Sequence, residues 1–172
     1  MSNKTPLLVF LAGAAAIAAI TCTFTVKQWE QALVLQFGEA QRVENAWGEE
    51  ANAGLKFKLP MPFETVVKLD RRNLEVDLKP VELLAADQER LVVDAFVRYR
   101  IRDGIRFYEA LQNEIGAQQK LQSIMDSTLR DVLGRVETPE IIAGRRAELM
   151  SEIQQVSNNV ANTQRLGVEI ID

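Results

Sequence analysis

The sequence contains no histidine. Histidine is the commonest general base, the usual partner of a nucleophilic serine or cysteine, and a frequent zinc ligand, so its absence removes most familiar routes to hydrolysis and metal binding. The single cysteine, Cys22, cannot form an internal disulfide and lies in an apolar run. We therefore expect no active site, no metal and no cofactor. The alternative is a hydrolase whose active site is formed by carboxylates that converge in a pocket. The adjacent Glu49 and Glu50 are the candidate acidic pair for such a site.

An excess of positive charge is also missing, because the net charge of the chain is −4. Such a chain has no field that attracts a phosphate backbone, which argues against nucleic acid as a partner. No glycine-rich phosphate loop is present either.

One long apolar run dominates the amino-terminal part of the chain. From Pro6 to Val26 the sequence reads "PLLVFLAGAAAIAAITCTFTV", 21 residues without a charge. As a helix it would be roughly 31 Å long, which matches a hydrocarbon core of about 30 Å. We expect a transmembrane anchor at residues 6–26, with residues 1–5 in the cytoplasm because of Lys4, and residues 27–172 outside it. A cleaved signal peptide and a lipoprotein modified at Cys22 are the alternatives.

The remainder reads as strands followed by helices. Apolar residues alternate with polar ones over residues 31–37, 55–59, 63–69, 74–78 and 91–101, as in half-buried strands. In the second of these, Leu55 and Phe57 are expected to be buried and Lys56 to face water. Spacings of three, four and seven then predict helices over 104–136 and 138–166, before a last strand at "VEIID". We expect an α+β fold in which helices cover an antiparallel sheet, forming one domain over residues 27–172.

A proline hinge joins two of these strands. Pro60 and Pro62 end one alternating run and begin the next, which leaves Leu59, Met61 and Phe63 as an apolar tip. The tip either packs into the core or rests in the outer leaflet of the membrane near the anchor.

Several arginines share a strand face or stand in adjacent pairs: Arg98, Arg100, Arg102, Arg71 and Arg72. Residues two apart on a strand point the same way, so the first three form a row. The row is either a solvated face balanced by acids such as Asp94 and Asp103, a contact between subunits, or a contact with anionic lipid. The pair Arg71 and Arg72 invites the same interpretations.

Several motifs occur in an order typical of one family. After the apolar run come "ALVLQFGE", "GLKFKLP" running into "PFETVVKLDRR", and "RLVVDAFVRYRI" followed by "RFYEA". In this order they resemble the band 7 or SPFH family of stomatins, prohibitins, flotillins and HflK/HflC proteins, and most closely its HflC branch. The resemblance extends from the apolar run through "GVEIID". It implies an SPFH domain over residues 27–172.

The resemblance implies a scaffold and not an enzyme. HflC-like proteins assemble with HflK-like partners into large oligomers in microdomains of the bacterial inner membrane, with the SPFH domain on the periplasmic side. There they modulate the membrane protease FtsH. A tethered extracytoplasmic module that binds lipid or protein without regulating a protease is the alternative function.

Two departures from the family pattern accompany the resemblance. Family members continue from the SPFH domain into a long coiled coil that residues 1–172 do not include, so we expect this chain to be truncated after the SPFH domain. The family also usually has proline where Ala53 precedes "GLKF", which leaves this turn less rigid.

Overall fold

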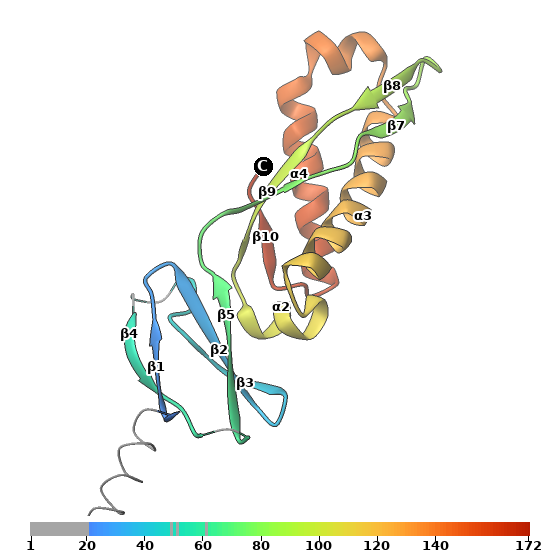
Figure 1. Cartoon of the computed structure of the whole chain (residues 1–172). Helices are drawn as coiled ribbons and strands as arrows, with labels where there is room; N and C mark the ends of the chain where they lie inside the picture. The colour runs from blue at the N-terminus through green and yellow to red at the C-terminus, as the bar shows by residue number, and fades with distance from the viewer. Residues whose placement is uncertain (1–20, 49, 51, 61) are drawn as a thin grey trace, which may run out of the picture. The chain divides into compact units, whose positions relative to one another are not determined.

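The chain folds into two compact units, which we call unit 1 (Met1–Leu69) and unit 2 (Asp70–Asp172) (Figure 1). The structure, a computed structural model, describes residues 21–48, 50, 52–60 and 62–172. Most of the expected transmembrane segment therefore lies outside the described residues. Its last four residues form strand β1 instead of a helix, as suits their β-branched and aromatic side chains. Among the described residues, none of the helices combines the length and apolarity needed to span a bilayer.

Unit 1 is built of short strands: β1 (Thr23–Val26), β2 (Glu30–Gln36), β3 (Glu39–Glu44), β4 (Gly54–Phe57) and β5 (Glu64–Asp70), whose last residue begins unit 2. Strand β1 pairs antiparallel with β4, and β2 lies between β3 and β5. The core centres on β2, where Leu33 and Val34 are fully buried. The sequence analysis missed β3. It pairs with β2 across a tight turn, where Phe37 and Gly38 have positive φ angles of 51° and 93°.

The expected alternation along β4 is present, but its faces are reversed. Leu55 and Phe57 are 62% and 72% exposed, whereas the Lys56 side chain is 16% exposed and pairs with Glu44 at 3.1 Å. The expectation that the lysine faces water was wrong. Strand β4 belongs to a two-stranded sheet, and its inner face is filled by the ion pair.

Unit 2 contains the following elements: β6 (Leu74–Asp77), β7 (Val81–Leu84), β8 (Arg90–Val93), β9 (Phe96–Ile101), α2 (Gly104–Leu111), α3 (Glu114–Leu133), the π-helical turn η1 (Glu140–Gly144), α4 (Arg146–Thr163) and β10 (Val168–Ile170). Strand β9 lies between β10 and β6, antiparallel to both, and β7 pairs with β8 in a separate hairpin. The expected run 91–101 is thus divided between β8 and β9.

Helices α3 and α4 cover one face of the β10-β9-β6 sheet (Figure 1). Val97, Tyr99 and Ile101 on β9 are at most 2% exposed, and so are Leu121 on α3 and Leu149 on α4. The α+β class with antiparallel strands and covering helices is confirmed. The described residues, however, form four small sheets and not one continuous sheet. The expectation of one domain over residues 27–172 stays a prediction.

A side-chain contact joins the β7–β8 hairpin to the segment before η1. The amide and hydroxyl of Thr138 both donate to the Asp87 carboxylate, each at 3.1 Å. The Thr138 hydroxyl therefore bonds to Asp87 and does not cap the helical segment that follows it. Burial raises the pKa of Asp87, but the bonds from Thr138 and Glu89 outweigh it and hold the pKa below its usual range.

Candidate functional site

Unit 1 carries a group of exposed apolar side chains, which we call the apolar tip: Phe37, Phe57, Leu59 and Phe63. Their side chains are 73%, 72%, 49% and 48% exposed, respectively. The rings of Phe37 and Phe63 meet edge to face with centroids 5.9 Å apart, and the Phe37 amide donates to the Phe63 carbonyl. Leu59 and Phe63 were expected here, while Met61 lies outside the described residues. The core-packing alternative does not hold for Leu59 and Phe63.

Phe37 was missed by the sequence analysis. Gly38 between two strand-like segments is a turn signal that places Phe37 at the end of a hairpin. Its contact with Phe63 depends on the pairing of β2 with β5, which no local pattern encodes.

Buried polar contacts hold the proline hinge in place. The Glu64 carboxylate, on a residue only 7% exposed, accepts a bond from the Leu59 amide at 2.8 Å and pairs with Arg42 at 3.5 Å. The Phe63 amide donates to the Pro60 carbonyl at 3.0 Å, which closes the turn. Leu59 and Phe63 are thereby fixed at the two ends of one turn.

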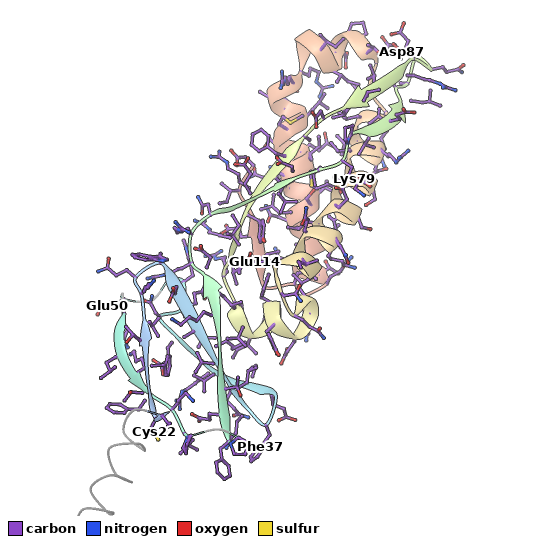
Figure 2. The ribbon with its side chains drawn as sticks, in the orientation of Figure 1. Cys22, Phe37, Glu50, Lys79, Asp87 and Glu114 are labelled. Carbon is purple, nitrogen blue, oxygen red and sulfur yellow. The ribbon has the colours of Figure 1, made fainter. Side chains whose placement is uncertain are left out.

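The apolar tip lies beside the point where the described chain begins. The Lys58 amide donates to the Cys22 carbonyl at 2.8 Å, so Phe57 and Leu59 flank the residue bonded to Cys22. Figure 2 shows Phe37 and Cys22 at the same end of unit 1. An anchor that ends near Thr21 would therefore bring the tip close to the membrane surface.

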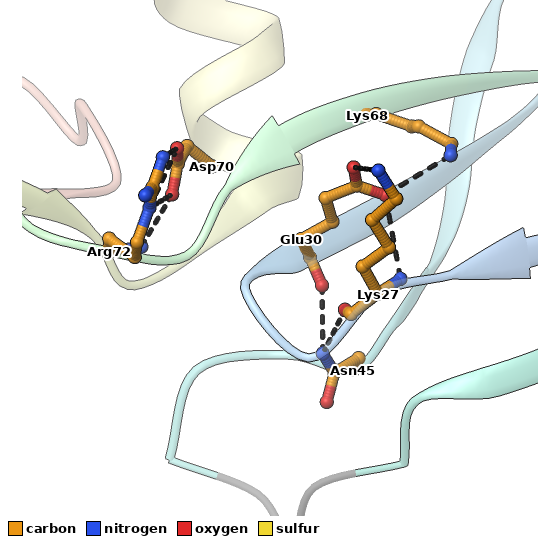
Figure 3. Close-up of polar contacts among 6 residues, drawn as sticks. All are labelled: Lys27, Glu30, Asn45, Lys68, Asp70 and Arg72. Carbon is orange, nitrogen blue, oxygen red and sulfur yellow. Dashed lines mark hydrogen bonds and ion pairs between the residues drawn. The ribbon is translucent and has the colours of Figure 1, made fainter.

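The turn that follows β1 is organised by a buried asparagine. Asn45 is 2% exposed, and its side-chain amide donates to the carbonyls of Lys27, Gln28 and Glu30 at 3.3, 3.4 and 2.8 Å. Its side-chain oxygen accepts a bond from the Asn52 amide. Figure 3 shows Asn45 under the turn that connects β1 to β2. One side chain thus connects this turn with the loop that precedes β4.

Glu30 in the same turn lies between two lysines (Figure 3). Its carboxylate is 3.1 Å from Lys68 Nζ and 4.0 Å from Lys27 Nζ. The hydrogen bond from Lys68 lowers the pKa of Glu30, and the Lys27 amide adds to the effect. Glu30 therefore stays charged at neutral pH and connects β2 with β5.

The two arginines after β5 stand where the units divide. Arg72 bonds to the Asp70 carboxylate through its backbone amide at 2.8 Å and its guanidinium at 2.7 Å, and this contact lowers the pKa of Asp70 (Figure 3). Arg71 is half-buried. The contact of Arg72 with Asp70 fixes the turn locally, so the contribution of this pair of arginines to a subunit interface stays a prediction.

The arginine row along and just after β9 is paired with acids in and just after β10. Arg98 makes a two-point contact with Asp172, Arg100 Nε lies 2.7 Å from the Glu169 carboxylate, and Arg102 lies 3.6 Å from it. The balancing acids are therefore not the expected Asp94 and Asp103. Asp103 caps α2 and pairs with Arg106 instead. The charged face is satisfied within the described chain, while its use between subunits stays a prediction.

We expect the stability of unit 2 to fall at acid pH through Glu169. The bond from Arg100 lowers the pKa of Glu169 below its usual 4.5. A lowered pKa contributes stability that is present above pH 4.5 and lost as the pH falls through the folded-state value. In urea titrations, Glu169→Gln should cost about 1 kcal/mol at pH 7 and should flatten the loss of stability between pH 5 and 3.

The matched control for this prediction is Glu82→Gln, which removes the same charge from an exposed position on β7. It should leave both the stability at pH 7 and its acid dependence close to those of the parent chain. An identical acid profile for the Glu169→Gln and parent chains would contradict the assigned role of the Arg100 contact.

The described acids do not gather as a catalytic or metal site would require. Within the described part of the chain, no group of three His, Cys, Asp or Glu side chains could hold a metal ion. Asp103 and Glu169 each lie within 3.6 Å of an arginine nitrogen.

Comparison with known proteins gives one family and one group of relatives. The model of the family described as "SPFH domain / Band 7 family" matches residues 24–172. "Protein HflC" of Buchnera aphidicola subsp. Acyrthosiphon pisum is 28% identical, over 96% of this chain and 58% of that protein. "Modulator of FtsH protease HflC" of Escherichia coli K12 is 29% identical, over 79% of this chain and 41% of that protein. "Protein HflC" of Haemophilus influenzae is 27% identical, over 96% of this chain and 56% of that protein.

These similarities confirm the resemblance noted in the sequence. The chain spans about half the length of the curated relatives that it matches. The family match, in contrast, runs from β1 to the last residue and includes both units. This chain therefore belongs to the SPFH domain / Band 7 family.

Proposed function

We propose that the chain is an HflC-like scaffold subunit, held in the bacterial inner membrane by an apolar anchor that precedes β1, that oligomerises with an HflK-like partner and modulates an FtsH-type membrane protease. The observation that carries this proposal is the family match over residues 24–172 together with relatives named HflC, one of which is named a modulator of FtsH protease. That name describes an effect on a protease and not a proteolytic activity. A role without catalysis agrees with a sequence that lacks histidine.

The apolar tip supports a position of unit 1 at the membrane surface. Phe37 and Phe57 are each more than 70% exposed, and such side chains are costly in water and stable at a bilayer interface. The Lys58–Cys22 bond ties the tip to the residue after which β1 begins. We propose that the apolar tip, together with Met61, rests in the outer leaflet beside the anchor, with the units on the periplasmic side.

Affinity purification from bacterial inner membranes tests the assembly. The full chain, expressed with its likely HflK-like partner and extracted gently, is expected to elute as a high-mass complex that contains the protease, by native mass measurement. A purely monomeric chain would overturn the proposal and favour the alternative, a tethered module that binds lipid or protein. A matched control replaces residues 6–20 by an unrelated membrane span, which leaves Cys22 and β1 in place. Assembly should survive in it if the two units make the contacts.

A further inference from the structure

Strands β6 and β7 form one side of a long antiparallel ribbon in unit 2, and β9 and β8 form the other side (Figure 1). Along this ribbon the side chains alternate between two faces. One face is buried, and its residues, such as Val76, Leu83 and Val97, are at most 7% exposed. The opposite face is exposed from Asp77 to Phe96. The whole ribbon belongs to unit 2, so this face does not depend on how the two units are arranged.

Three large apolar side chains lie on the exposed face. Leu84, Val92 and Phe96 are 58%, 67% and 57% exposed. Val92 pairs in register with Glu82, and Phe96 with Asp77. Side chains at such paired positions are direct neighbours across the ribbon, so two of the apolar side chains each stand beside an acid. We call this surface the hairpin face: Asp77, Glu82, Leu84, Val92, Asp94 and Phe96.

The excess negative charge of the chain is concentrated in the same ribbon. Residues 74–96 contain six acids and two bases, a net charge of −4, which equals the net charge of all 172 residues. The charges of the rest of the chain are therefore balanced. Asp77, Glu82 and Asp94 are exposed, and none of them makes an ion pair within 4.0 Å with another described residue.

The neighbouring cations do not neutralise these acids. Lys79 and Arg90 are the two bases of the segment, and neither makes an ion pair with a described residue. Arg98, the next cation along β9, is held by Asp172. Four of the six negative charges in residues 74–96 thus have no compensating charge in that segment.

This combination of exposed apolar side chains and uncompensated acids restricts the kind of partner. If the hairpin faces of two copies met, the same acids would come together, and like charges oppose such a contact. An anionic membrane surface is opposed for the same reason. A basic segment with an apolar stripe suits both features of the face. The ribbon is two strands or about 10 Å wide, which matches the diameter of a helix, about 10 to 12 Å.

We propose that the hairpin face docks a basic amphipathic helix of a partner protein. Val92 and Phe96 are four positions apart on extended chain, about 13 Å. Apolar residues seven or eight positions apart on a helix lie on one face and span about 10 to 12 Å, so one apolar stripe covers both. Lysines or arginines beside the stripe meet Asp77, Glu82 and Asp94. This surface goes beyond the scaffold role, and it stands even if that role fails.

Binding of a synthetic helix to the full chain in a non-ionic detergent tests the proposal. The probe is a blocked peptide of about 18 residues, or five turns, with leucines along one face, lysines beside them and alanine elsewhere. The parent chain and each variant are immobilised on separate sensors, so that binding of the peptide to detergent cancels. Asp77→Asn combined with Glu82→Gln should weaken binding about tenfold or more and make it less sensitive to salt.

Glu109→Gln combined with Glu152→Gln is the matched control for this double change. It also removes two negative charges, but from exposed positions on α2 and α4. Binding of the peptide should be the same as to the parent chain. Circular dichroism checks that both double variants keep their helices and strands.

The apolar part of the hairpin face has a test of its own. Phe96→Ser should weaken binding about fivefold or more, because the leucines of the peptide lose their largest contact. Ile115→Ser is the control, since Ile115 is 68% exposed on α3, outside the hairpin face, and this change should leave binding unaltered.

Other occupants of the face give different results, and each would overturn the proposal. Unchanged binding after the Asp77 and Glu82 changes, or equal binding of a peptide with glutamates in place of its lysines, would exclude a basic helix. A lower native mass of the full chain after Phe96→Ser would assign the face to a second copy. Carbodiimide labelling of Asp94 should fall when the peptide binds in detergent, and should not fall in phosphatidylglycerol vesicles without peptide. Protection by the vesicles alone would assign the face to a bilayer.

Discussion

Gly167→Ala is expected to unfold unit 2 at a markedly lower temperature than the parent chain. Gly167 has a φ of +69°, and an added Cβ would lie 2.4 Å from the Asp103 carbonyl oxygen and 2.6 Å from the Phe107 amide nitrogen. Both neighbours are backbone atoms at the start of α2, so neither can swing aside. We expect a loss of about 3 kcal/mol, which for a unit of this size lowers Tm by roughly 12 to 24 °C.

The two units can be followed separately in this experiment. Both tryptophans, Trp29 and Trp47, lie in unit 1, whereas α2, α3 and α4 lie in unit 2. The transition seen by far-ultraviolet circular dichroism should therefore shift more than the transition seen by tryptophan fluorescence.

Gly38→Ala is the matched control for the steric part of this effect. Gly38 has a φ of +93°, but an added Cβ there meets nothing within 4 Å. Only the cost of the left-handed conformation remains, about 1 kcal/mol, and it should appear in the fluorescence of unit 1. If Gly167→Ala destabilised the protein no more than Gly38→Ala does, the close approach of Gly167 to α2 would be refuted.

Replacing both Phe37 and Phe63 by serine should release unit 1 from membranes. Each ring is about half to three-quarters exposed in the folded chain, and its transfer into an interface contributes about 1 to 1.5 kcal/mol. In flotation with vesicles, a chain that begins at Thr21 should show a partition coefficient roughly 30 to 150 times lower after the double change. Folding should be little affected, which a thermal transition followed by tryptophan fluorescence checks.

Phe96→Ser is the control for this experiment. Phe96 is 57% exposed but lies on β9 in unit 2 and does not belong to the apolar tip. It should leave vesicle binding unchanged. Equal loss of binding from Phe96→Ser and from the double change would mean that general apolarity, and not the tip, holds the chain to the bilayer.

The order and type of most elements follow from local patterns in the amino-acid sequence. The period of two over residues 63–69 and 74–78 and the apolar stripes over 104–136 found strands β5 and β6 and helices α2 and α3. Such periods are local, because they arise from the geometry of a single strand or helix. The ordered motifs likewise led to the family, which the match over residues 24–172 confirmed. Strand β3 was missed because its polar residues lack this alternation.

Only the tertiary structure decided which face of an alternating strand is covered and which charges meet. The alternation of apolar and polar residues along β4 does not say whether Leu55 or Lys56 points inward. In the folded chain Lys56 points inward, because it pairs with Glu44 on β3, and Leu55 is exposed. Arg100 pairs with Glu169, 69 positions away along the chain, and Phe37 meets Phe63 only because β2 pairs with β5. These contacts join segments far apart in sequence. Their residues carry no local signal, since the chain must fold before they become neighbours.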